Sequence, residues 1–212
     1  RLRSDDAYTP DGKASFRPDY AVKVYSNILK ELYPDVPVVI GGIEASLRRV
    51  THYDYWQDKL LPSILVDSKA DYLIYGMGER PIVEIARGYD EGLSDYHFRK
   101  IPQIGYITKR GETSGDDTIV LKSYEECLAS KKTFVENFNI IEVEANKLHA
   151  KRLVEPVGDS EVVINPPFPP ATEEEMDSYF DLPFTKLPHP RYKGKRIPAY
   201  DMIKFSINIH HG

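Results

Sequence analysis

Residues 37–58 read PVVIGGIEASLRRVTHYDYWQD, a stretch that passes from an apolar run through two glycines into a charged and aromatic segment. The run at residues 38–40 (VVI) is β-branched throughout, which is typical of a strand buried on both faces of a parallel sheet. Gly41 and Gly42 can turn the chain sharply after this strand, because glycine accepts a positive φ. Open α/β sheets bind ligands outside the carboxyl ends of their strands. The stretch therefore predicts an α/β fold with a ligand-binding edge at this turn.

The same pattern recurs further along the chain. Residues 71–75 (DYLIY) read as a strand, residues 76–80 (GMGER) as a turn and residues 81–87 as a helix. Successive turns of this kind lie at one edge of a mostly parallel sheet, because the crossovers between parallel strands are right-handed. The candidate cofactor-binding residues at this edge are Gly41, Gly42, Glu44, Gly76, Gly78 and Glu79.

These glycines and acids also have a purely structural interpretation. The glycines can serve turn geometry alone, and each glutamate either caps helix amides or points into the crevice. Neither turn matches G-x-G-x-x-G, and the chain lacks G-x-x-x-x-G-K-[ST], so neither NAD nor ATP is specifically indicated.

The amino-acid composition limits the class of protein to which the chain can belong. The 212 residues are 41% hydrophobic and 29% charged, which is typical of a globular protein. No apolar run reaches the ~18 residues of a membrane-spanning helix, and no signal-peptide pattern opens the chain, so we expect a cytoplasmic protein without membrane contact. The net charge of −5 argues against nucleic acid as a partner, and we expect Arg48, Arg49 and residues 193–196 (KGKR) to be solvated surface.

The cysteine count and the positions of the histidines argue against several kinds of metal site. Cys127 is the one cysteine, so the chain has no internal disulfide and cannot by itself hold zinc or an iron-sulfur cluster. We expect it on the apolar face of a helix. His210 and His211 are adjacent at the end of a predicted strand, where their side chains would point to opposite faces, so no metal ligand is assigned to them.

Three segments complete the predicted organisation. Residues 1–122 form the α/β domain, in which helix 19–32 packs its apolar face on the sheet and strands 102–108 and 118–121 form a hairpin. Residues 123–160 contain one long helix to about residue 152 and a linker, bridging two regions. Residues 161–212 begin with a short strand, continue as a Pro-rich irregular segment, and end in a half-buried strand at residues 205–209.

Several stretches of the sequence resemble one protein family. These stretches closely resemble the YgiQ family of radical SAM proteins. They are GGIEASLRRVTHYDYWQDKLLPSILVDSKADYLIYGMGERPIVEIA from Gly41, NPP from Asn165, LPHPRY from Leu187 and IPAYDMIKFSINIHHG from Ile197. The resemblance covers essentially the whole chain. It implies a Rossmann-like domain, incomplete at its N-terminus and related to the cobalamin-binding domain of other radical SAM enzymes, up to about residue 122. It also implies that the strand from Phe205 is the first of the radical SAM barrel.

The resemblance also implies where the cofactors bind. In the family a C-x-x-x-C-x-x-C loop follows the His-Gly that here ends the chain, and its thiolates would bind a [4Fe-4S] cluster that chelates S-adenosylmethionine. His210 and Gly212 would position that loop. We therefore expect a fragment of a longer protein, with neither cluster nor catalysis of its own. The D-x-H-x-x-G motif of cobalamin ligation is absent. A corrinoid bound on the glycine turns stays open as an alternative.

Two functions from different classes follow. In the first, the parent protein reductively cleaves S-adenosylmethionine and acts on an unknown small-molecule or macromolecular substrate. In the second, this chain is a binding module for a nucleotide, a corrinoid or a partner protein, without catalysis of its own. Strand 205–209, without its barrel neighbours, would also be available for self-association.

Overall fold

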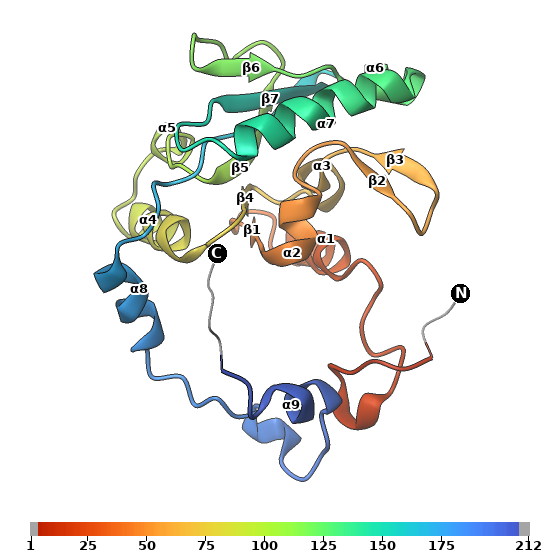
Figure 1. Ribbon diagram of the computed structural model, residues 1–212, viewed down its shortest axis with the longest axis vertical. Coiled ribbons are helices and arrows are strands. Elements are labelled where there is room, and N and C mark those ends of the chain that lie inside the picture. The colour runs from red at the N-terminus through yellow and green to blue at the C-terminus, as the bar shows by residue number, and fades with distance from the viewer. Residues whose placement is uncertain (1–3, 208–212) are drawn as a thin grey trace. The chain divides into compact units, whose positions relative to one another are not determined.

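The computed structural model describes residues 4–207, which divide into two compact units (Figure 1). Residues 22–171 form the sheet unit, and the described residues on either side of it, 4–21 and 172–207, form the terminal unit. No helix in the described part of the chain is long and apolar enough to cross a membrane.

A six-stranded mixed sheet organises the sheet unit. The strand order is β1-β4-β5-β8-β7-β6. The pairs β1·β4 and β6·β7 are parallel, and the three pairings between them are antiparallel. The strands are β1 Val39–Ile40, β4 Tyr72–Ile74, β5 Ile104–Lys109, β6 Thr118–Val120, β7 Arg152–Val157 and β8 Ser160–Ile164.

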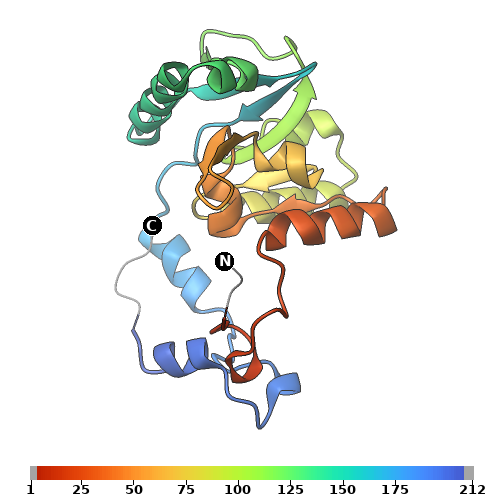
Figure 2. The same ribbon diagram turned by 90° about the vertical axis from the view of Figure 1, so that its right-hand side faces the viewer.

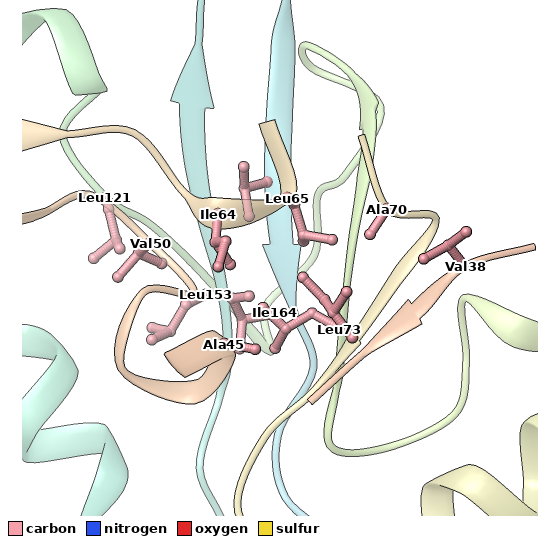
Figure 3. Packing of buried hydrophobic residues seen from close by; sticks show 12 residues of the cluster. Val38, Ala45, Val50, Ile64, Leu65, Ala70, Leu73, Leu121, Leu153 and Ile164 are labelled. Carbon is pink, nitrogen blue, oxygen red and sulfur yellow. The ribbon is translucent and has the colours of Figure 1, made fainter. Parts of the chain in front are cut away.

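Helices lie on both sides of this sheet (Figures 1 and 2). The helices of the sheet unit are α1 Ala21–Leu32, α2 Gly42–Leu47, α3 Ile64–Ser68, α4 Glu79–Asp90, α5 Asp95–Phe98, α6 Tyr124–Ala129 and α7 Lys131–Ala145. Alternating strand residues fill two cores because successive side chains point to opposite faces. Leu73 packs with Ala45 of α2 and Leu65 of α3, whereas Tyr72 and its neighbours pack with Ile85 of α4. Figure 3 shows the first core. The predicted α/β, Rossmann-like fold with flanking helices is confirmed.

The predicted long helix at residues 123–152 is wrong. Ser130 has extended backbone angles, ends α6, and caps α7 by accepting a hydrogen bond from the Thr133 amide. Helix α7 ends at Ala145, and β7 begins at Arg152. The serine side chain bonds a backbone amide and thereby competes with a continuous helix. The spacing of apolar residues does not register such a bond, so it did not reveal the break.

The predicted hairpin between residues 102–108 and 118–121 is also wrong, although both strands exist. Strand β5 pairs with β4 and β8, and β6 pairs with β7. The hairpin of this sheet is β7–β8, whose turn holds Gly158 at φ 55°. This hairpin brings residues 152–164 between the two predicted partners.

Helix α1 forms as predicted, but most of its apolar face is exposed. Ile28 and Leu29 are each 45% exposed. The inward contacts are largely polar: Lys23 pairs with Asp67 at 2.9 Å, and the Asn27 amide donates to the Asp67 carbonyl at 3.0 Å. These ion-pair and hydrogen-bond partners on α3 fix the rotation of α1, which the apolar pattern alone could not predict.

The segment after α2 is a second, two-stranded sheet instead of more helix. Strands β2 His52–Asp54 and β3 Lys59–Leu61 pair antiparallel, and the next helix, α3, begins at Ile64. Trp56 lies in the turn between them and is 63% exposed, so it is not a core residue of this chain.

The terminal unit consists of short elements held by local contacts. They are the 3₁₀ helices η1 Pro10–Gly12 and η2 Pro190–Tyr192, with helices α8 Glu173–Phe180 and α9 Pro198–Ile203. A capping box formed by Thr172 and Glu175 begins α8, and the amide of Ala199 donates to the carbonyl of Ala7. Residues Phe205 to Ile207 do not form the predicted strand, since they have no neighbouring strand to pair with among residues 4–207. Residues 208–212, with the rest of that prediction, lie outside the described residues.

Candidate functional site

The two glycine turns lie at one edge of the sheet. Strands β1 and β4 are parallel neighbours, with Val39 opposite Tyr72 and Ile40 opposite Leu73. Their carboxyl ends therefore lie side by side, and the prediction that both turns share one edge is confirmed.

A cavity of about 370 Å³ opens beside this edge, and we call it the edge cavity. Its walls come from α2, the turn after β4, the last turns of α7, β7 and the end of β8. Its polar wall residues include Ser46, Arg49, Tyr75, Lys151 and Asn165. The volume falls within the range of small-molecule sites, and the position matches the ligand edge of open α/β sheets.

Gln103 holds the turn that contains Gly76. Its Nε2 donates to the carbonyl of Tyr75 at 2.7 Å and to the carbonyl of Met77. Its Oε1 accepts a hydrogen bond from the Phe168 amide at 3.2 Å. Gly76 has φ 65°, and a Cβ there would lie 3.4 Å from the Gln103 Nε2, so the turn and its clamp require glycine.

Asn165 fixes the opposite wall. Its Nδ2 donates to the carbonyls of Arg99 and Ile101 at 2.9 and 2.7 Å, and its Oδ1 accepts from the Arg152 Nε at 3.1 Å. Its carbonyl accepts a hydrogen bond from the Tyr75 hydroxyl. Burial raises the pKa of Tyr75, so this hydroxyl stays a donor at neutral pH. Asn165, the first residue of the NPP segment, thereby holds together the end of β8, the start of β7, the turn after β4 and the segment at residues 99–101.

Arg49 faces this cavity, and the prediction that Arg48 and Arg49 are solvated surface is wrong. Arg48 pairs with Glu44 at 3.2 Å and with Asp54 at 3.7 Å, its side chain 23% exposed. Arg49 donates from Nη1 to the Ser46 carbonyl at 2.7 Å, and its guanidinium lies 5.2 Å from the centre of the Tyr75 ring. Burial lowers the pKa of Arg49, against an opposing contribution from the charge of Glu142.

A second cavity of about 470 Å³ adjoins the first, and we call it the groove cavity. Arg49 and Ile141 line both cavities, while the groove cavity adds apolar side chains of α7 such as Phe134 and Phe138. Burial lowers the pKa of His52 in its wall, so this imidazole is neutral at pH 7. The groove cavity is therefore the more apolar of the two.

The predicted cofactor-binding residues take different positions around the edge. Gly76 lines the edge cavity, whereas Gly41, Gly42, Glu44, Gly78 and Glu79 line neither cavity. Glu44 accepts the Val22 amide at the start of α1 at 3.3 Å and pairs with Arg48, so it caps a neighbouring helix. Gly78 caps α4, and a Cβ there would lie 3.3 Å from Ile74. His210 and Gly212 lie outside the described residues. The cofactor-binding role of all eight stays a prediction.

Four residues of the site were not predicted: Arg49, Tyr75, Gln103 and Asn165. Tyr75 directly follows β4, and Asn165 directly follows β8, so a search for polar residues at strand ends would have found both. Gln103 has φ 65°, which the sequence does not signal.

The residues present do not fit an iron-sulfur cluster. A [4Fe-4S] cluster that chelates S-adenosylmethionine needs three thiolates, and Cys127 is the one cysteine of the chain. Its thiol is buried beside Asn137, and burial raises its pKa to about 11. Among residues 4–207, no group of three His, Cys, Asp or Glu side chains could hold a metal ion.

The sheet, the helices on both of its faces and the cavity at the strand ends define a Rossmann-like α/β domain. The chain belongs to the Radical SAM N-terminal family, whose model matches residues 1–206.

Its curated relatives carry the designation UPF0313 protein. It is 58% identical to the one from Bacteroides thetaiotaomicron, 56% to that from Porphyromonas gingivalis and 45% to that from Geobacter sulfurreducens. Each match covers 100% of this chain but 36%, 34% and 35% of the respective relative. The chain therefore spans about a third of their length. No solved structure matches it.

Proposed function

We propose that this chain is the N-terminal domain of a radical SAM enzyme of the YgiQ family. The full-length protein would reductively cleave S-adenosylmethionine, with a [4Fe-4S] cluster held by residues outside these 212. The family match over residues 1–206 carries this proposal. The single buried cysteine supports assigning the cluster ligands to the remaining two thirds of the relatives' length.

Within that enzyme, the glycine edge would face the mouth of the barrel. Gly41, Gly42, Glu44, Gly76, Gly78 and Glu79 would border this crevice, and His210 and Gly212 would position the cluster loop. In this chain, Gln103 and Asn165 hold the walls of the edge cavity in place whatever the substrate is.

Iron content tests the proposal. After anaerobic reconstitution with iron and sulfide, the full-length protein should bind about four iron atoms per chain, the content of one [4Fe-4S] cluster. The 212-residue chain, treated in parallel, serves as the matched control and should retain no stoichiometric iron. Stoichiometric iron in the control, or none in the full-length protein, would contradict the proposal.

A second candidate is a binding module without catalysis of its own. The edge cavity favours it, because this cavity occupies the ligand edge of the sheet without needing a barrel, and the groove cavity adjoins it. Ligand binding by the 212-residue chain, together with a full-length protein that binds no iron, would favour this candidate over the first.

A further inference from the structure

Two adjacent arginines, Arg48 and Arg49, directly follow α2 and differ in their partners. Arg48 is paired with the carboxylates of Glu44 and Asp54. Among residues 4–207, no Asp or Glu forms an ion pair with Arg49, whose contacts are the Ser46 carbonyl and the Tyr75 ring. A guanidinium has five N–H donors, so most of those on Arg49 remain available.

The burial of Arg49 makes this lack of a counter-charge costly. Removing a cation from water without an anionic partner in contact is unfavourable, and burial lowers the pKa of Arg49 for that reason, while the more distant charge of Glu142 acts in the opposite direction. A bound anion would restore the missing interaction, and guanidinium groups match the geometry of carboxylate and phosphate oxygens.

The charges of the two walls decide which cavity an anion would enter. Glu142, exposed on α7, lines the groove cavity and disfavours an anion there. The edge cavity has the cations Arg49 and Lys151 and the single acid Glu144.

Glu144 is already compensated. Its Oε1 pairs with Lys147, and its Oε2 accepts the Lys151 amide at 2.8 Å. These contacts lower the pKa of Glu144, the Lys147 bond contributing most. The net charge that the edge cavity presents to a ligand is therefore positive.

We propose that the edge cavity binds a small molecule through an oxyanion group, a phosphate or a carboxylate, held by the guanidinium of Arg49. The Tyr75 ring, 5.2 Å from the guanidinium, and the Ser46 carbonyl fix its orientation. Lys151 also lines the cavity, and its Nζ donates to the Asp116 carbonyl at 2.9 Å. This inference goes beyond the proposed function and does not depend on it, because every residue it uses lies in this chain.

The test is a titration of the 212-residue chain with inorganic phosphate and, separately, with acetate, at constant ionic strength. Binding is followed by NMR through the Nε–Hε resonance of Arg49. We expect a saturable shift of this resonance in the wild-type chain. Tighter binding of phosphate would indicate a phosphate ester as the ligand, and tighter binding of acetate would indicate a carboxylate.

Arg49→Met removes the charge and keeps much of the side-chain volume. Charged hydrogen bonds contribute about 1.5–3 kcal/mol, so we expect at least about a tenfold loss of affinity. Arg87→Met is the matched control, because Arg87 is exposed on the last turn of α4 and lines neither cavity. Arg49→Lys keeps the positive charge but lacks the planar guanidinium group with its paired N–H donors, and should give an intermediate affinity.

The proposal would be overturned by an unshifted Arg49 resonance at saturating concentrations of both anions. It would also be overturned if Arg87→Met weakened binding as much as Arg49→Met, since that result indicates general surface attraction. If Arg49→Met does not fold, the wild-type resonance and Arg49→Lys still decide the outcome. Iron binding by the full-length protein is a separate measurement, so failure here is distinguishable from failure of the proposed function.

Discussion

Glu155 is a carboxyl group buried in the sheet unit. It lies on β7, is 1% exposed, and its Oε2 accepts the amide of Thr51 at 2.8 Å. Burial raises the pKa of Glu155 from 4.5 to about 7, while the Thr51 hydrogen bond acts in the opposite direction. The folded chain therefore holds a proton on this group at pH values where the unfolded chain has released it.

The free energy of unfolding should consequently depend on pH through Glu155. Because its pKa is raised in the folded state, the stabilising contribution is fully present below pH 4.5 and is lost as the pH rises through about 7. The loss is on the order of 3 kcal/mol, since one pKa unit corresponds to about 1.4 kcal/mol. Glu155→Gln should remove this dependence and unfold at higher urea concentration than the wild type at pH 8.

Glu136→Gln is the matched control, since Glu136 is an exposed acid on α7. It should leave the pH profile of the unfolding free energy unchanged. A wild-type profile that Glu155→Gln leaves unaltered would show that this carboxyl is not the titrating group.

At the scale of the element, Ser130 separates two helices that the apolar pattern merged. Its Oγ accepts the Thr133 amide at 3.3 Å, and Asn137 of α7 bonds both the amide and the carbonyl of Lys122. The second contact folds α7 back towards the segment before α6. Such contacts between residues far apart in sequence are not encoded in periodicity, which explains the wrong prediction.

Replacing Ser130 tests the cap. Ser130→Ala should lower the free energy of unfolding by about 1 kcal/mol, the typical value of a lost N-cap. Ser130→Asp should retain most of the stability because aspartate also caps helices. Urea unfolding followed by circular dichroism measures both. An alanine variant of unchanged stability and higher helix content would favour the continuous helix instead.

Elements that depend on local signals were predictable. The β-branched run predicted β1, and DYLIY predicted β4. The β2–β3 sheet and the rotation of α1 were missed, because the exposed Tyr53 and Ile28 carry an apolar pattern without being core residues. Their positions depend on partners elsewhere in the chain.

At the scale of the whole molecule, the sequence predicted the edge but not the cavity beside it. Parallel β1 and β4 place both glycine turns together, as right-handed crossovers require. The walls also need α7, Asn165 and the half-buried Arg49, which come together only when the β7–β8 hairpin enters the sheet. The position and charge of the cavity are therefore tertiary properties.

The chain matches relatives about three times as long, so the catalytic proposal concerns the full-length protein. The most direct measurement is the anaerobic incubation of that reconstituted protein with S-adenosylmethionine and dithionite, followed by chromatography of the products. We predict equal amounts of 5′-deoxyadenosine and methionine, and neither product from the 212-residue chain alone. A full-length protein loaded with its cluster that releases no 5′-deoxyadenosine would contradict the account.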